Sequence, residues 1–291
     1  MRRRLSRATR PPHFAQIALA AALALSPGCG DKAAETSMRA LHIDHMPQIK
    51  RWVHADRKKH REALAQAATR LTKVLLRQPR DTDRLRRALK RLRHPKHGVR
   101  GLIASPLSFV AALDDKGIVL ARGAEPDRLQ GRDFAKPFNP VRTALSAGKA
   151  QQGLVDFAAA SQPRKKPRPS MLFVEPVQHQ GKPLGALVLG IPLARWAQRL
   201  SRQLQLEHGD EVGLTLWAYF YRGGLLFEKG TPPELDDALP DAGARAALLR
   251  QAPRGFVRAL DMHGRSYGWG MLPLPALGDD VGVLLVRAEA P

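Results

Sequence analysis

The sequence predicts an α+β protein in which a long N-terminal helix is followed by two tandem antiparallel-sheet modules of the same design. Three observations predict this class. Apolar residues recur at helical spacing from about Met38 to Arg93. Short β-type runs separated by turns begin after Pro106. The second half of the chain then repeats glycine and proline spacings found in the first half.

The N-terminus combines positive charge with a short apolar run, Phe14–Leu25, which suits the core of a signal peptide and is too short to span a bilayer. The next residues, Leu25-Ser26-Pro27-Gly28-Cys29, resemble a bacterial lipobox. The resemblance implies a signal peptide over 1–28, lipid on Cys29, a flexible tether over 29–37, and an exported, membrane-anchored lipoprotein facing the periplasm. The alternative is an ordinary secretory signal in which Cys29, the only cysteine, is incidental.

Residues 38–100 form a basic helical segment. Six apolar residues share one helical face, namely Leu64, Ala67, Ala68, Leu71, Val74 and Leu75. Pro79 and Asp81 interrupt this pattern, so we expect a long helix and then a shorter one that carries Leu85, Leu89 and Leu92. Asp81 or Thr82 would serve as the N-cap of the second helix.

The formal net charge of +22 is unevenly distributed. Residues 38–100 hold 19 Lys/Arg against five Asp/Glu, whereas residues 201–291 are slightly acidic. An exported chain rarely meets nucleic acid, so we expect no nucleic-acid partner. An anionic membrane surface close to the lipid anchor is one possible partner for the basic segment. A solvated helical face in an Arg-rich protein is an equally good explanation.

The first sheet module is predicted over 101–192. Its strands are expected at Phe109–Leu113, Ile118–Ala121, Leu154–Ala160, Met171–Val177 and Leu184–Ile191, with a short helix at Asn139–Ser146. A linking helix at Leu193–Glu207 falls within a linker over 193–210, and the second module covers 211–291. The repeat predicts that both modules have the same element order, because Pro176 and Gly185 are nine residues apart, as are Pro273 and Gly282.

Several short motifs resemble the Cache family of extracytoplasmic sensor domains. They are Phe109–Gly117 (FVAALDDKG), Leu129–Asp133 (LQGRD), Val174–Val177 (VEPV) and Gly181–Val188 (GKPLGALV). The resemblance covers about 40–290 and implies a long helix with two PAS-like antiparallel sheets. It also implies small-molecule binding and a signalling or transport protein as a possible partner.

No residue pattern supports catalysis, so the chain is not expected to be an enzyme. It has no Gly-x-Ser-x-Gly elbow and no phosphate-binding loop, and we expect no cofactor. His42 and His45 are three residues apart, as are His94 and His97, but no set of Cys or carboxylate ligands accompanies them. We therefore interpret these histidines as solvated helix residues and expect no metal site.

The candidate ligand-binding residues lie on the sheets. In the second module, alternation places Thr215, Trp217, Tyr219 and Tyr221 on one strand face, and Tyr267, Trp269 and Met271 on another. Gly268 and Gly270 leave the opposite face bare, so a helix or a ligand must pack closely there. Arg254 and Arg258 could bind a carboxylate, and Arg142, Asp156 and Glu175 are the comparable groups in the first module. The alternative is that the aromatic residues form ordinary core.

Two functional hypotheses follow. The first is a membrane-tethered extracytoplasmic lipoprotein that senses or binds a small, anionic organic ligand. The second is a structural or protein-interaction lipoprotein of the cell envelope that keeps the fold without a ligand pocket. A concave, partly polar cavity in either module would favour the first hypothesis.

Overall fold

The structure is a computed structural model that describes residues 29–77, 81–103, 108–157, 168–208, 210–228, 230–262 and 264–289. The signal peptide expected over 1–28 and the side chain of Cys29 lie outside these described residues.

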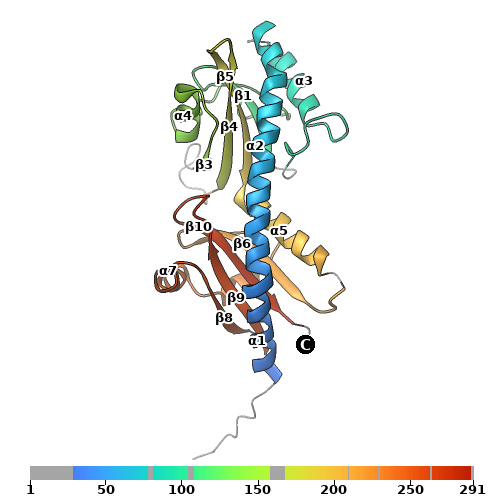
Figure 1. The fold of residues 1–291 in the computed structure, drawn as a ribbon, viewed down its shortest axis with the longest axis vertical. Helices are drawn as coiled ribbons and strands as arrows, with labels where there is room; N and C mark the ends of the chain where they lie inside the picture. The colour runs from blue at the N-terminus through green and yellow to red at the C-terminus, as the bar shows by residue number, and fades with distance from the viewer. Residues whose placement is uncertain are drawn as a thin grey trace, which may run out of the picture.

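One long helical rod runs beside both sheets (Figure 1). It consists of α1 (Cys29–Ala40), a π-helical turn η1 (Leu41–His45) and α2 (Met46–Arg77). The expected flexible tether over 29–37 is wrong for the described residues, because α1 is helical and packs against the second sheet. Its buried residues Ala34 and Ser37 explain the difference: small side chains let the helix lie close to the strands.

Helix α2 is held by the apolar face that the sequence predicts. Leu64, Ala67, Leu71 and Leu75 are all buried, which confirms the helical periodicity. The shorter helix α3 (Thr82–Leu92) begins after Asp81, whose Oδ1 accepts a hydrogen bond of 2.9 Å from the backbone N–H of Arg84. Asp81 is therefore the N-cap.

The first sheet contains β1 (Phe109–Leu113), β2 (Val119–Arg122), β3 (Gln151–Asp156), β4 (Pro169–His179) and β5 (Lys182–Pro192). All neighbouring strands are antiparallel, in the order β2-β1-β5-β4-β3. Helix α2 covers one face of this sheet and α4 (Asn139–Ala147) covers the other (Figure 1). The third strand begins at Gln151, three residues before the expected start.

The second sheet repeats this topology. Its strands are β6 (Thr215–Arg222), β7 (Leu225–Phe227), β8 (Phe256–Met262), β9 (Arg265–Pro273) and β10 (Val281–Ala288), in the order β7-β6-β10-β9-β8. Two short helices, α6 (Pro233–Ala238) and α7 (Ala242–Gln251), occupy the place of α4 in the chain order. The predicted α+β class with two tandem modules is confirmed.

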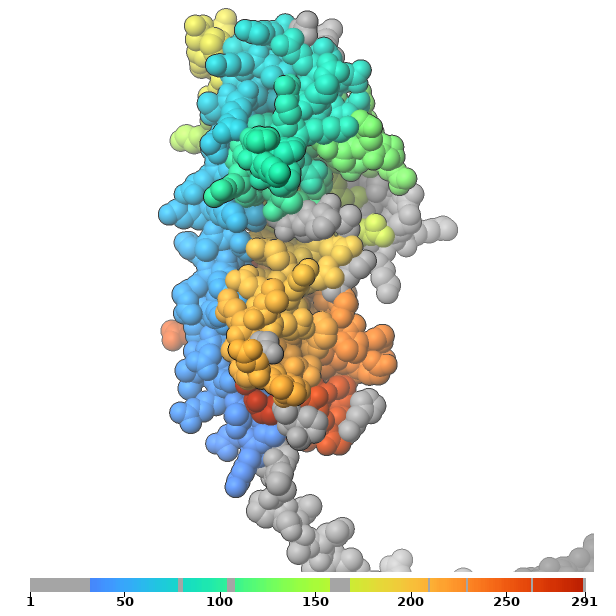
Figure 2. All heavy atoms as spheres, turned by 90° about the vertical axis from the view of Figure 1, so that its right-hand side faces the viewer, coloured from blue at the N-terminus to red at the C-terminus, as the bar shows by residue number. Residues whose placement is uncertain are grey.

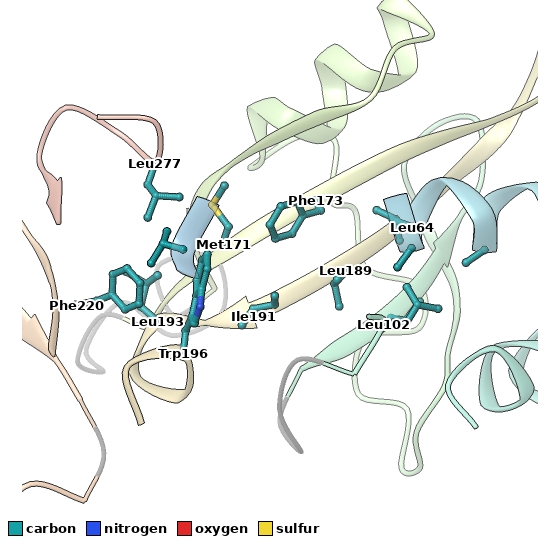
Figure 3. Close-up of a cluster of buried hydrophobic side chains, with 14 of the residues drawn as sticks. Leu64, Leu102, Met171, Phe173, Leu189, Ile191, Leu193, Trp196, Phe220 and Leu277 are labelled. Carbon is teal, nitrogen blue, oxygen red and sulfur yellow. The ribbon is translucent and has the colours of Figure 1, made fainter. Parts of the chain in front are cut away.

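The two modules share one hydrophobic core. Helix α5 (Leu193–Glu207) links the sheets, and its Trp196 packs against Phe220 of β6 with ring centroids 5.1 Å apart. Figure 3 shows Met171 of the first sheet and Leu277 of the second module beside this pair. The indole Nε1 of Trp196 also donates a 3.1 Å hydrogen bond to Asp56 on α2. The long helix forms one side of both modules in the space-filling view (Figure 2).

Within the described part of the chain, no helix has both the length and the apolar character needed to cross a bilayer.

Candidate functional site

The sheet face under α4 is filled by aromatic side chains. Phe109, Phe134, Phe138 and Phe157 form a cluster in which neighbouring ring centroids are 4.8 to 6.4 Å apart, mostly edge to face. Three residues of the adjoining core, Val141, Leu172 and Val188, are fully or almost fully buried. The described residues on this face therefore form packed core.

The second module has an aromatic core in the corresponding place. Tyr219, Tyr267 and Trp269 share one buried cluster with Leu235 of α6, and Trp217 packs against it, so the faces predicted for the two strands lie on the same side of the sheet. The Tyr219 hydroxyl donates a 2.8 Å hydrogen bond to Asp236. Burial raises the pKa of Tyr219 well above its ordinary value. The alternative interpretation holds for these residues: they are core rather than the wall of an open ligand site.

The bare face left by two glycines is occupied by the long helix. A Cβ atom on Gly268 would lie 2.8 Å from the backbone nitrogen of Met38, and one on Gly270 would meet the Met46 side chain. The close partner predicted for these glycines is therefore a helix.

The remaining candidate groups of the first hypothesis do not converge. Arg142 is exposed and donates to the Asn139 side chain at 2.8 Å. Arg254 and Arg258 are exposed. Asp156 accepts a 3.1 Å hydrogen bond from the backbone N–H of Arg168. None of these four lines a described cavity.

Glu175 is the exception, because it lies in a groove between α2 and the sheets. This helix groove consists of three adjoining cavities. The lower cavity (about 640 Å³) shares His54 and Arg57 with the middle cavity (about 530 Å³), which shares Ala65 and Glu175 with the upper cavity (about 500 Å³). All three volumes fall in the range of roughly 300–1,000 Å³ that is typical of small-molecule sites.

The spacing of residues on α2 builds one wall of the middle cavity. His54, Arg57, Lys58, Arg61, Glu62 and Ala65 line it. They recur every three or four residues, so they form one flank of the helix beside its buried face. The first sheet forms the opposite wall through Glu175 of β4 and Ala150, the residue before β3. The small side chains of Ala65 and Ala150 leave the space open.

The charges in the middle cavity are only partly balanced. No described carboxylate lies within 4.0 Å of the Arg57 or Arg61 guanidinium, and no described cation lies that close to Glu175. Burial, followed by repulsion from Arg61, lowers the pKa of Arg57. Burial raises the pKa of Glu175, and the nearby Arg61 opposes this. Desolvated charges without partners are typical of binding sites.

Arg57 also has an unsatisfied hydrogen-bond donor. Its Nε atom is buried and has no acceptor among the described residues. A buried donor without an acceptor costs free energy unless a ligand or water supplies one. His54, Arg57 and Arg61 are site residues that the sequence does not single out. The signal available was a row of cations, three to four residues apart, beside the buried face of a helix.

The histidine pairs do not form metal sites within the described residues, which contain no group of three or more potential ligands. His94 and His97 stack with ring centroids 5.1 Å apart and are exposed. His45 was expected to be solvated, but it is buried, and its Nε2 lies 2.7 Å from a nitrogen of Arg287 on β10. The interpretation of solvated histidines is therefore wrong for His45.

Comparison with known proteins gives matches among solved structures only. No protein-family model matches the chain, and no curated protein matches it. The sensory domain of the Campylobacter jejuni chemoreceptor Tlp3, with isoleucine bound, is similar with a TM-score of 0.53 and 12% sequence identity, over 91% of this chain and 97% of that one. An extracellular ligand-binding receptor from Desulfohalobium retbaense has a TM-score of 0.50 and 13% identity, over 84% of this chain but 39% of that chain.

These identities are low, so the similarity concerns the fold. Both matches extend over most of this chain, which is built from the long helix and the two sheets. The chain therefore has the fold of the Cache-type domains that bacterial sensors place outside the cytoplasm.

Proposed function

We propose that this chain is an extracytoplasmic ligand-binding module of the sensor type, held at a membrane by lipid on Cys29. Its ligand is a small organic anion that binds in the middle cavity of the helix groove. One observation carries the proposal: Arg57 and Arg61 line a cavity of suitable size in which no described carboxylate pairs with them. A guanidinium donates two parallel hydrogen bonds to a carboxylate, so arginine suits this role.

The fold supports this proposal, because one similar structure is a chemoreceptor domain with isoleucine bound. An amino acid carries a carboxylate and an ammonium group. The middle cavity offers cations for the first group and Glu175 for the second. We therefore include both amino acids and simple dicarboxylates among the candidate ligands.

The competing hypothesis is a protein-interaction module without a small ligand. The aromatic side chains that fill the sheet faces opposite α2 favour it. The two hypotheses differ in what the helix groove does, since an interaction module would not need a ligand there.

A thermal-shift screen with amino acids and dicarboxylates, followed by calorimetry, tests the proposal. A true ligand at 100 times its Kd should stabilise the protein by about 2.7 kcal/mol. Arg57→Gln should strongly reduce this stabilisation, because it removes the cavity cation whose buried Nε has no acceptor among the described residues. Arg70→Gln should keep it, since Arg70 is exposed on the same helix but lines none of the described cavities.

Glu175→Gln adds a second comparison. If the ligand is an amino acid, this variant should weaken it more than it weakens a dicarboxylate, because the carboxylate that faces the ammonium is lost. The competing hypothesis prevails if no anion of either class stabilises the wild-type protein.

A further inference from the structure

The lower cavity of the helix groove differs in chemistry from the middle one. Its lining includes seven apolar residues, Pro47, Val53, Pro273, Leu274, Pro275, Ala276 and Leu277. The other lining residues are basic: Lys50, Arg51, His54 and Arg57. None of the lining residues is acidic, so the cavity combines an apolar floor with a positive rim.

The lower cavity lies between the long helix and the second module. One wall is α2, and the other is the connection between β9 and β10 of the second sheet. The connection is held in place by two backbone hydrogen bonds of 2.8 Å, from Leu274 to Val281 and from Leu277 to Leu274. Leu274 and Leu277 are buried, and Leu277 reaches the core shared by the modules (Figure 3). The apolar floor is therefore preformed.

Arg57 lies where the two cavities meet, because it lines both of them. An anion bound by Arg57 would have apolar surface on one side and polar surface on the other. A hydrophilic anion would leave the apolar floor in contact with water, whereas an apolar group attached to the anion would cover it.

We infer that the ligand of the helix groove is an amphipathic carboxylate whose apolar body fills the lower cavity and whose carboxylate pairs with Arg57. This inference rests on the proposed function and deepens it by naming the ligand class. Such a ligand contacts α2 and the β9–β10 connection, with its carboxylate where the lower cavity meets the middle one.

Calorimetry with hexanoate, octanoate and decanoate, each kept below the concentration at which micelles form, tests the inference. Binding should tighten about fourfold for each added methylene until the cavity is full. Decyltrimethylammonium has the same tail and the opposite charge, and it should not bind, because the rim is positive.

Ala276→Glu provides the site-specific variant. Ala276 is an exposed member of the apolar lining, so the substitution adds a negative charge without removing core packing. Decanoate should bind at least tenfold more weakly to this variant, and the neutral, similarly sized Ala276→Gln should bind it nearly as well as wild type.

The outcomes separate this inference from the proposed function. If succinate or glutamate binds, depends on Arg57 and is unaffected by Ala276→Glu, while decanoate does not bind, the proposed function stands and the amphipathic ligand class is overturned. If decanoate binds and its affinity is unchanged by both Arg57→Gln and Ala276→Glu, it binds outside the lower cavity, which also overturns the inference. If no anion of either kind binds, both fail.

Discussion

His45 is a buried residue of the long helix whose protonation opposes the folded state. Arg287 can only donate, so the 2.7 Å contact requires the His45 Nε2 to accept and the ring to be neutral. Burial first, and then repulsion by Arg287 and His208, lowers the pKa of His45 to about 4. Asp44 and Gln48 on the same helix act in the opposite direction but do not offset these effects.

The sign of the resulting pH dependence follows from this pKa. In the unfolded chain His45 binds a proton near pH 6.5, and in the folded protein only near pH 4. The contribution of neutral His45 to the free energy of unfolding is therefore fully present above pH 6.5 and falls as the pH drops to 4. The loss should reach at most roughly 3 kcal/mol. Urea unfolding at pH 7 and pH 4.5 measures it.

His45→Gln should flatten this pH dependence, because its side-chain oxygen can still accept from Arg287 but does not titrate. The exposed His42, changed to Gln, is the matched control and should leave the slope unchanged. An equal slope in wild type and His45→Gln would assign the effect to other groups.

Glu211 also contributes to the pH dependence. Its pKa is lowered, first by its hydrogen bond to His208, so its contribution to the free energy of unfolding is lost as the pH falls through this lowered pKa.

The candidate site residues differ in how far the local sequence predicts their positions and roles. Alternation alone predicts that Tyr219 and Tyr221 share a face of one strand and that Tyr267 and Trp269 share a face of another, because strand geometry is local. Whether these residues form core or a ligand site is left open by the sequence, because the packing of α6 over them decides it. Arg57 is one cation in a highly basic segment, and what sets it apart is the covering by Pro273–Leu277, more than 200 residues later in the chain.

At the scale of elements, the contact between α1 and β9 depends on Gly268, which has no side chain on the strand face that meets the helix. Gly268→Ala would place a methyl group 2.8 Å from the Met38 nitrogen and 2.9 Å from the Ser37 carbonyl carbon. These are backbone atoms and cannot rotate away, so α1 must shift. We expect a loss of about 1–3 kcal/mol in the free energy of unfolding, measured by chemical denaturation.

Gly243→Ala is the matched control for this prediction. Gly243 is exposed within α7, and among the described residues the new methyl group would approach only a side-chain oxygen of Asp241, at 3.2 Å. Alanine favours a helix over glycine, so this variant should be neutral or slightly stabilising. Equal stability of the Gly268 variant and wild type would mean that α1 does not pack against β9 as described.

Elements with strong local signals were predicted well. Helix α5 has the bounds expected from its periodicity, and β1 has the expected bounds as well. The start of α1 differs from the prediction, because small polar residues over 30–37 are typical of tethers, whereas Ala34 and Ser37 are buried where α1 packs against β9. Tertiary contacts, which the local pattern does not contain, decided this boundary.

At the scale of the whole molecule, Cys29 and the first module lie at opposite ends of the long rod (Figure 1). A helix rises about 1.5 Å per residue, so the stretch from Cys29 to Arg77 is about 70 Å long. The basic helix α3 follows the far end of this rod. If lipid on Cys29 holds the protein at a membrane, α3 is therefore remote from that membrane. The membrane surface is then a poor partner for the basic residues of α3.

The proposed anchor predicts the behaviour of one variant. Cys29→Ser removes the thiol to which lipid would be attached, so the protein should move from the membrane fraction to the soluble fraction, or accumulate as an uncleaved precursor. Detergent-phase partitioning and immunoblotting measure this. Retention of a cleaved Cys29→Ser protein in the detergent phase would contradict lipid anchoring, and the exposed Ser146→Ala is a control that should partition like wild type.

The contacts of α1 and η1 also determine when the protein can fold. The Ser37 hydroxyl donates a hydrogen bond to Glu289, 252 residues later in the chain. His45 accepts one from Arg287, 242 residues later. Closing a loop of that length costs about 5 kcal/mol of chain entropy beyond a constant, and contacts between such distant residues slow folding. The first helix to be synthesised must therefore wait for the final strand before its binding surface exists. Helix α1 and the turn η1 therefore lack most of their packing surface until β8, β9 and β10 have been translated, whereas α2 can pack on the first sheet earlier.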